Sequence, residues 1–446
     1  MHKIPRPTLT EQIKLSSQYK KNYILAEMNL QKKYGDVFRI KMPFRAVYFF
    51  HPKHIKIILK DKAKDFQKSK NYKFIMPFVG KGLVTSEGEL WRKQRRIVGS
   101  EFHVGAVNRY FEIFLKNTQN LFEEWDEKIQ KNSPVNLSND IARLTLWNVG
   151  GALFGIEFKK EIENIGDSLE ICLQHALYRL ASIIKIPAGA PTPRNLNAKK
   201  ANQILNQVVL NIIQQGGNGS LNKANALLRL IHAVDEETQT QMDEQQLIDE
   251  VKTLVLAGHE TTSLAISWSF YLLTLYPNYE KILLDEIREH FNGRTPTLDD
   301  LQNLKWCKAF ILETMRLYPP VPSISKKSIQ ELDVDGVRVN PRDTVVIAPY
   351  ITHRHKEFWE APEVFLPERF LNGSKAQQDV YAYIPFSAGP RGCLGEHFAM
   401  LEAQLTFVLI LQKYKIQKLN SKPIQIKPML TLRMESDFII SLKPHA

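Results

Sequence analysis

The chain has 446 residues, of which 43% are apolar and 24% are charged. These proportions are close to the averages for globular proteins, so they exclude an extensively disordered chain and provide apolar surface for a large core. The formal net charge is +13, but the basic residues are spread out and lack the basic and aromatic interleaving of single-strand nucleic-acid binders. We therefore expect no nucleic-acid partner, and we interpret the positive charge as a surface for an acidic protein partner.

Cysteine usage and the N-terminal residues indicate the compartment. The three cysteines, Cys172, Cys307 and Cys393, are far apart. Their odd number argues against a disulfide framework and favours a reducing compartment, so we expect a cytoplasmic protein. The first ten residues contain no apolar stretch long enough for a signal peptide or a membrane span. We expect no membrane span, although removal of a leading segment would leave the same sequence.

In chain order, the first predicted elements are β-prone runs from Val37 to Ile40 and from Val47 to Phe50, followed by helical spacing from Pro52 to Lys60. They predict a small sheet near the N-terminus. From about Ala106 to Ser267 the pattern is mainly helical. Its clearest periodic stretches run from Phe111 to Glu123, from Ala142 to Phe154 and from Asn202 to Gln214.

Loop segments and later β-prone runs complete the predicted fold. Segments 187–195 and 215–220, rich in proline or glycine, predict exposed loops. The runs Val334 to Val339 and Val345 to Ile347 predict a hairpin that returns to the early sheet, and Ile424 to Leu442 alternates again. No repeat or clean boundary divides the chain. We predict a single domain over residues 1–446, mainly α-helical with small β-sheets drawn from both ends of the chain.

The most informative stretch for function is Phe-Ser-Ala-Gly-Pro-Arg-Gly-Cys-Leu-Gly, from Phe386 to Gly395. Its three glycines let the backbone lie close to a flat ligand and direct amides at the Cys393 sulfur. Residues 396–405 have the composition of a helix, whose N-terminus would favour thiolate over thiol. An isolated cysteine is more often an inert structural residue. The local pattern instead favours Cys393 as an iron ligand.

Phe386 to Gly395 fills every position of the cysteine-loop signature of the cytochrome P450 family: Phe, two variable, Gly, variable, Arg, variable, Cys, variable, Gly. The chain therefore resembles a cytochrome P450. The resemblance implies the P450 fold and haem b, with Cys393 as the axial ligand of the iron and with Phe386, Arg391 and Gly395 at the cofactor. A thiolate behind haem iron favours O–O cleavage, as is general for this family.

A second motif, Ala-Gly-His-Glu-Thr-Thr from Ala257 to Thr262, interrupts an apolar helix. Burial of Glu260 without a partner would be costly, and Gly258 removes bulk beside it, so we expect a small notch that holds water. The motif is similar to the family's oxygen-activation helix. The resemblance implies that Glu260 and Thr261 deliver protons and that Ala257 lies at the cofactor. The alternative is an ordinary helix with its polar stripe facing solvent.

Three histidines invite a metal site that their spacing does not support. His259 has no His or Cys partner at ligand spacing, and His353 and His355 form only a His-Arg-His run. We interpret His259 as packed or solvent-facing, and the other two as structural.

A charged pair predicts a supporting network. Glu313 and Arg316 are three residues apart on a predicted helix, close enough to pair, but such pairs are common and contribute little when exposed. The resemblance adds Arg369, within the Pro-Glu-Arg-Phe run at 367–370. It implies a buried network of the three residues that supports the cysteine loop.

Basic residues are candidates for binding the haem propionates. Trp91 and Arg95 lie four residues apart on a basic helix and match the family's propionate pair, and Arg391 is the third candidate. An arginine suits a carboxylate because its planar fork bonds both oxygens. Lys326 stands where many relatives have an arginine, which leaves the remaining propionate contact open.

The resemblance implies a monooxygenase that hydroxylates a hydrophobic small molecule, such as a fatty acid or terpenoid, with O2 and two electrons. No fused flavin or nicotinamide site is visible, so we expect a separate acidic ferredoxin or flavodoxin with its reductase. We expect a monomeric, soluble, bacterial-type member. Two alternatives stay open: a peroxide-dependent peroxygenase on the same fold, and a non-catalytic haem sensor or carrier.

The substrate pocket is predicted only as apolar. The family places specificity in segments around residues 71–84 and 172–188 and near residues 324 and 430. Apolar side chains in these segments fit a pocket, although the same residues could simply be core. The candidate pocket residues are Phe74, Phe78, Ile184, Ile324 and Leu430.

Overall fold

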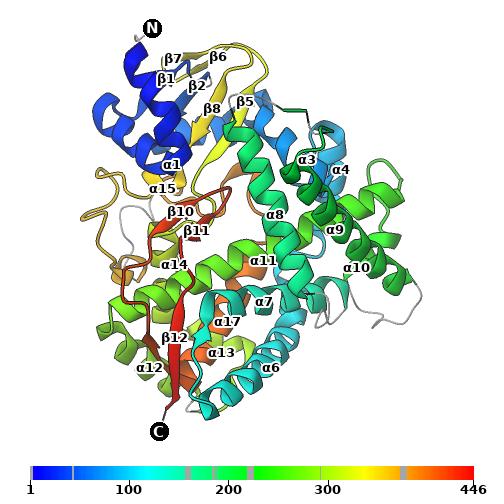
Figure 1. Cartoon of the computed structure of the whole chain (residues 1–446), viewed down its shortest axis with the longest axis vertical. Coiled ribbons are helices and arrows are strands. Elements are labelled where there is room, and N and C mark those ends of the chain that lie inside the picture. Colours follow the sequence, from blue (N-terminus) through cyan, green and yellow to red (C-terminus); the bar gives the residue numbers. More distant parts are fainter. Residues whose placement is uncertain are drawn as a thin grey trace.

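The structure is a computed structural model that describes residues 4–42, 45–155, 162–182, 186–187, 189–217, 226–291, 293–371 and 379–445. It confirms the mainly α-helical fold with small β-sheets predicted from the sequence. In Figure 1 the sheet built near the N-terminus lies at one end of the molecule, and helix α11 (Glu244–Leu275) runs through the middle of the helices that fill the rest. Within the described ranges, no helix combines the length and apolarity needed to cross a bilayer.

The N-terminal sheet joins distant parts of the chain. Its five strands have the order β1-β2-β8-β5-β3, with β2 parallel to β8 and all other neighbours antiparallel. Tyr48 of β2 packs with helix α1 (Leu9–Tyr34). Val47 and Phe49 pack with α2 (Pro52–Lys56) and η1 (Ile57–Asp61) on the other face, as alternation along a strand requires. The strands are β1 (Val37–Ile40), β2 (Ala46–Phe49), β3 (Phe66–Lys68), β5 (Ile324–Ser328) and β8 (Thr344–Ile347).

The predicted hairpin between Val334–Val339 and Val345–Ile347 is wrong. β6 (Leu332–Val334) and β7 (Val337–Val339) form their own hairpin, and only β8 joins the early sheet. The connection is Asp335-Gly336, and both residues have positive φ, 52° and 78°. Such a two-residue turn closes a hairpin within the first predicted run.

The helical body contains most of the remaining residues. The helices are α1 (Leu9–Tyr34), α2 (Pro52–Lys56), η1 (Ile57–Asp61), η2 (Ala63–Asp65), η3 (Lys70–Phe74), α3 (Met76–Val79), α4 (Gly88–Gly99), α5 (Val104–Val107), η4 (Asn108–Tyr110), α6 (Phe111–Gln130), α7 (Leu137–Val149), η5 (Gly150–Phe154), α8 (Ile162–Ala181), α9 (Pro193–Gly217), α10 (Ala226–His232), α11 (Glu244–Leu275), α12 (Asn278–Phe291), α13 (Leu298–Asn303), α14 (Lys305–Leu317), α15 (Pro349–Thr352), η6 (Pro367–Phe370), η7 (Gly389–Arg391) and α17 (Glu396–Lys413).

The two predicted loops are shorter than expected. Helix α9 begins at Pro193, where proline is tolerated because the first amide of a helix needs no partner within it. The same helix continues to Gly217, and residues 218–220 lie outside the described part of the chain.

Helix α11 is the longest helix described, with 32 residues. The expected water-holding notch at Gly258 is replaced by a helix contact. A Cβ on Gly258 would lie 2.8 Å from Cγ2 of Val149, so glycine lets α11 and α7 approach closely. The notch prediction is therefore wrong on this side of the helix.

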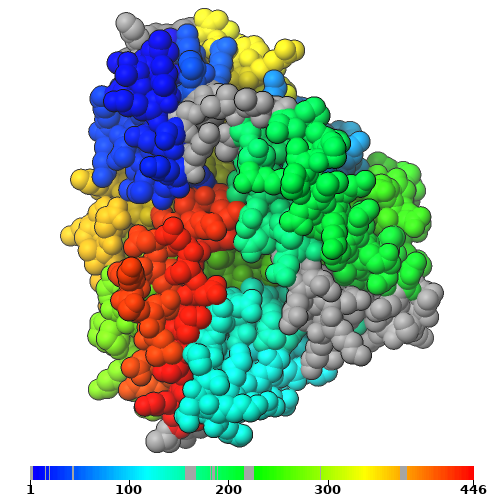
Figure 2. All heavy atoms as spheres, viewed as in Figure 1, coloured from blue at the N-terminus to red at the C-terminus, as the bar shows by residue number. Residues whose placement is uncertain are grey.

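The C-terminal strands lie against the helical body. β12 pairs with both β4 and β9, and β10 pairs with β11 in a separate hairpin. In Figure 2 the C-terminal segment, in red, lies between the blue N-terminal region, the green α8 and α9 region and the cyan α6 region. The strands are β4 (Val135–Asn136), β9 (Tyr414–Lys418), β10 (Ile426–Pro428), β11 (Leu432–Met434) and β12 (Ile439–Pro444).

Candidate active site

The cysteine loop is held by its own backbone and by one neighbouring segment. The Cys393 amide donates a hydrogen bond to the Phe386 carbonyl at 2.8 Å, and the Gly392 amide donates one to the Gly389 carbonyl at 2.9 Å. Gly389 has a φ of 70°, and a Cβ there would lie 1.9 Å from the Leu59 carbonyl oxygen. Only glycine fits at this position, because the loop packs directly on the backbone of η1.

Cys393 is exposed to solvent but has protein atoms packed around it. The side chain is exposed, yet the protein around it excludes enough water that desolvation raises the pKa of the thiol. The negative charge of Glu396 also raises the pKa of the thiol, whereas the Gly395 amide and the Arg95 guanidinium lower it. The loop and helix α4 thus each offer one group that favours the thiolate.

Trp91, Arg95 and Arg391 meet at the cysteine loop. Arg95 donates from Nη1 to the Gly392 carbonyl at 2.7 Å. The Arg391 guanidinium lies 3.6 Å from the centroid of the Trp91 ring and forms an ion pair with Glu87. Burial lowers the pKa of Arg95 and of Arg391, but guanidinium groups stay charged in proteins. Helix α4 and the loop therefore present fixed positive charge together.

Two lysines extend this positive region. Lys326 of β5 and Lys68 of β3 are direct partners across the antiparallel pair. Burial, with Arg391 nearby, lowers the pKa of Lys326 to about 8 and that of Lys68 to about 7. Glu87 favours their charged forms. Lys68 is missing from the sequence prediction, because only the register of β3 against β5 reveals it.

The α11 motif places hydroxyl groups along the helix. Thr261 donates from Oγ1 to the Ala257 carbonyl at 2.8 Å, and Thr262 donates to the Gly258 carbonyl at 3.1 Å. Ala257 is exposed although it lies midway along α11, whereas Val255 and His259, two residues away on either side, are buried. These bonds fix the orientation of the Thr261 hydroxyl and leave its oxygen able to accept a further hydrogen bond.

Glu260 is buried and has partners that the sequence prediction lacks. Its Oε1 accepts hydrogen bonds from Thr431 Oγ1 and from Arg433 Nε, each at 2.7 Å. The adjacent His259 is also buried, and burial lowers its pKa to about 4. His259 is therefore neutral near pH 7 and packed, one of the two interpretations that the sequence left open.

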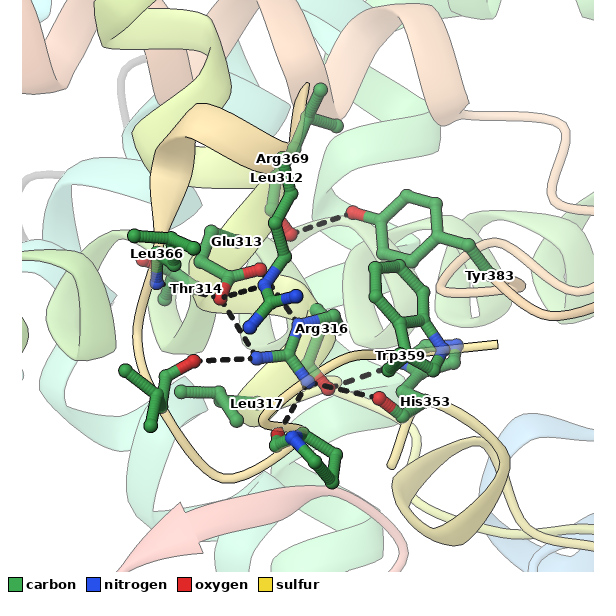
Figure 3. Close-up of polar contacts among 12 residues, drawn as sticks. Leu312, Glu313, Thr314, Arg316, Leu317, His353, Trp359, Leu366, Arg369 and Tyr383 are labelled. Atoms are coloured by element: carbon green, nitrogen blue, oxygen red, sulfur yellow. Dashed lines mark hydrogen bonds and ion pairs between the residues drawn. The ribbon is translucent and has the colours of Figure 1, made fainter. Parts of the chain in front are cut away.

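Glu313, Arg316 and Arg369 come together in a buried cluster (Figure 3). Arg316 donates from Nε and Nη2 to the two carboxylate oxygens of Glu313, both at 2.7 Å, and both side chains are fully buried. Arg369 Nε lies 3.5 Å from Glu313 Oε1. Arg316 also donates to the carbonyls of His353, Pro362 and Val364. The cluster therefore ties α14 to the following chain segments.

His353 connects this cluster to the segment before the cysteine loop. Its Nδ1 lies 3.2 Å from the Arg316 carbonyl oxygen, and the Ile384 amide donates to its Nε2 at 2.9 Å. These partners require a neutral ring with the proton on Nδ1. Burial accordingly lowers the pKa of His353 to about 3. The run His-Arg-His gave no sign of this contact, because Ile384 is 31 residues away.

The predicted pocket residues do not share one described cavity. Phe78 lines an apolar cavity of about 20 Å³, whose other walls come from α8, α9 and α11. Phe74 and Leu430 are partly buried against the main core, and Ile324 lies in β5 opposite Ile347. Ile184 lies outside the described residues.

The comparisons with known proteins point to one family. The family model of cytochrome P450 matches residues 4–441. Cytochrome P450 4Z1 of Homo sapiens is 28% identical over 424 residues, which cover 90% of this chain and 83% of the human protein. Cyclooctatin synthase of Streptomyces melanosporofaciens is 28% identical over 414 residues, which cover 90% of this chain and 87% of the bacterial protein.

A helical fold with a cysteine loop before its last long helix defines a haem-thiolate protein. The chain belongs to the cytochrome P450 family. It is accordingly a monooxygenase with a haem-thiolate cofactor, and it uses O2, a redox partner and hydrophobic substrates.

Proposed function

We propose that this chain binds haem b and that Cys393 is the axial ligand of its iron. The donor set fits the group, because one exposed thiol is accompanied by an amide and a guanidinium that favour negative charge on sulfur. Metal binding removes the thiol proton even where desolvation raises the pKa. This setting of Cys393 is the observation that carries the proposal. Phe386, Gly395 and Ala257 are proposed contacts of the macrocycle.

The positive region supports the proposal for the two haem propionates. Like charges directly across a strand pair destabilise each other, and Lys68 and Lys326 are such a pair. Carboxylates bound between them, with Arg391 and Arg95, would offset this repulsion and restore full charge to the lysines. Trp91 holds the Arg391 guanidinium by its ring face. Lys326 thus replaces the arginine that many relatives have.

Bound haem would supply dioxygen activation and transfer of one oxygen atom to a substrate C–H bond. We assign proton delivery to Glu260 and Thr261. The Thr261 hydroxyl, fixed on the Ala257 carbonyl, can accept a hydrogen bond from water and orient it. Glu260 is a buried carboxylate of the same helix, and a carboxylate of this kind can take up and release a proton.

Glu313, Arg316 and Arg369 are proposed to support the cysteine loop without entering the chemistry. The support runs from Arg316 through His353 to Ile384. Every Arg316 hydrogen bond is charge-assisted and directed at a carboxylate or carbonyl. The cluster therefore fixes the chain just before Phe386.

The substrate is proposed to be a fatty acid, a terpenoid or a similar apolar molecule. The hydrophobic substrates of the family support this class, whereas the apolar cavity at Phe78, about 20 Å³, is far smaller than such a molecule. We propose an acidic ferredoxin or flavodoxin as the electron donor. The formal charge of +13 supports an acidic partner, as do the exposed Lys56, just before η1, and Lys60 within it. The cysteine loop packs on this same helix.

We further propose a monomeric, cytoplasmic protein with a single domain over residues 1–446. Its three cysteines are free, which agrees with a reducing compartment. In addition, the core cluster that contains residues of α3 also contains residues of β12, so both halves of the chain share one core.

The proposed function is tested by product analysis with the haem-loaded protein. NADPH, a [2Fe–2S] ferredoxin and its reductase are supplied with a panel of fatty acids and terpenoids under ¹⁸O2. The proposal predicts one ¹⁸O atom in the product, dependent on NADPH. Turnover with hydrogen peroxide alone that the reductase does not exceed would favour the peroxygenase. Haem binding without product from any source of electrons or peroxide would favour the sensor or carrier.

A further inference from the structure

Glu260 is restrained from outside its own helix. Three contacts from the β10–β11 hairpin converge on its Oε1: Thr431 Oγ1, Arg433 Nε and Arg433 Nη2, each at 2.7 Å. The hydrogen bonds that described residues donate to this carboxylate all end on Oε1. Oε2 is therefore the oxygen left for exchange of a proton with water. The Glu260 side chain is 8% exposed, so these bonds are little weakened by solvent.

Arg433 has a second carboxylate partner on a different helix. Its Nη1 lies 3.0 Å from Oε1 of Glu170 in α8. The Glu170 side chain is 43% exposed, so its pair with Arg433 is the more solvated of the two. One guanidinium thus joins α8 to α11, two helices that cross near the centre of the view in Figure 1.

The backbone beside Arg433 is fixed on both sides. The Leu432 amide donates to the Pro320 carbonyl at 2.9 Å, and Trp268 Nε1 donates to the Leu432 carbonyl at 3.0 Å. Trp268 belongs to α11, so the hairpin keeps its place against that helix. A displacement of α8 would therefore change the Arg433–Glu170 distance much more than the Arg433–Glu260 distance.

We propose that Arg433 is a positioning residue that couples the placement of α8 to the proton transfer of Glu260. With Glu170 beside it, Arg433 divides its positive charge between two carboxylates and binds Glu260 Oε1 less strongly. With Glu170 withdrawn, Arg433 binds Glu260 alone and stabilises its anion. The position of α8 thereby sets how strongly Arg433 binds the Glu260 carboxylate during proton delivery. This inference rests on the proposed function of Glu260.

The test compares two sources of oxidising equivalents in the haem-loaded protein. Turnover with NADPH and O2 consumes protons, whereas hydrogen peroxide brings oxygen that already carries them. Glu170→Gln is expected to lower NADPH-driven product formation about three- to tenfold, the coupling typical within one charge network. Peroxide-driven turnover should stay within about twofold, because small surface changes rarely alter packing. Asp167→Asn, an exposed charge on the same helix, should change neither rate.

A second variant keeps the result interpretable. Arg433→Lys retains the charge but has no planar fork to bond two carboxylates at once. In that background Glu170→Gln should change the NADPH-to-peroxide ratio by less than about twofold. An undiminished effect of Glu170→Gln on this ratio in the Arg433→Lys background would overturn the coupling. So would an equal fall of the NADPH-driven and peroxide-driven rates in Glu170→Gln alone, or no fall in either rate. Each of these results would leave the monooxygenase activity itself unchallenged. A parent protein that forms no NADPH-dependent product would overturn both proposals.

Discussion

The guanidinium of Arg391 lies 3.6 Å from the centroid of the Trp91 ring. This contact joins the cysteine loop to α4. The Arg391 charge also lowers the pKa of Lys326 and of Lys68 nearby. Such an accumulation of partly buried cations favours an anionic ligand. The first prediction concerns the lysine that stands in place of the expected arginine.

Lys326→Met should weaken hemin binding by the apoprotein about tenfold or more, because a charge-assisted hydrogen bond to a propionate is lost. Hemin titration followed by absorption measures the affinity. Lys327→Met is the matched control, since neighbouring residues of β5 point to opposite faces. Equal weakening by the two substitutions would contradict the assignment of Lys326 to a propionate.

Gly389→Ala should prevent stable packing of the cysteine loop, because the new Cβ would lie 1.9 Å from the Leu59 carbonyl oxygen. Gly35→Ala is the control: Gly35 has a similar φ of 80°, but no atom lies within 4 Å of its Cβ position. In the control the free energy of unfolding should fall only by the conformational cost of alanine at positive φ, about 1–2 kcal/mol. Urea unfolding and haem content are measured together. Similar losses in both variants would show that the contact with η1 has no role.

Glu313→Gln should lower the free energy of unfolding by about 3–5 kcal/mol, because it strands the fully buried Arg316 charge. Glu331 pairs with Arg338, and both side chains are about half exposed, so Glu331→Gln should cost about 0–1 kcal/mol. Urea denaturation at pH 7 gives both values. A loss at Glu313 no larger than at Glu331 would remove the cluster as a support of the loop.

The buried His353 should make the protein sensitive to mild acid. Its folded-state pKa of about 3 lies below the ordinary value of 6.5. Between these two pH values the His353 ring is protonated in the unfolded chain and neutral in the folded chain. This contribution to stability is complete above pH 6.5 and is lost as the pH falls towards 3, at about 1.4 kcal/mol per pH unit.

Replacement of this ring by an amide tests the prediction. His353→Gln should reduce the slope of stability against pH between 6.5 and 4.5 by about one proton, measured by urea unfolding at several pH values. His103→Gln, at an exposed histidine, serves as control. An unchanged slope in His353→Gln would mean that the ring is not held neutral by burial.

Local patterns in the sequence located the cysteine loop and the α11 motif, because their residues are contiguous. The partners of these residues are not contiguous. Arg433 is 173 residues from Glu260, and Lys68 meets Lys326 only through strand register. Helix α1 is different, since Thr8 and Glu11 form a capping box whose pattern is readable in the sequence. The hairpin error likewise came from overlooking Asp335-Gly336 as a turn.

The proposed chemistry depends on the bond between the Cys393 sulfur and haem iron. It is tested most directly by the absorption spectrum of the reduced carbon monoxide complex, recorded for the parent protein and for Cys393→Ser, with Cys172→Ser as a control for a general effect of cysteine removal. We predict the red-shifted band of a thiolate-ligated haem in the parent and in Cys172→Ser, and its loss in Cys393→Ser. Persistence of that band in Cys393→Ser would contradict the assignment.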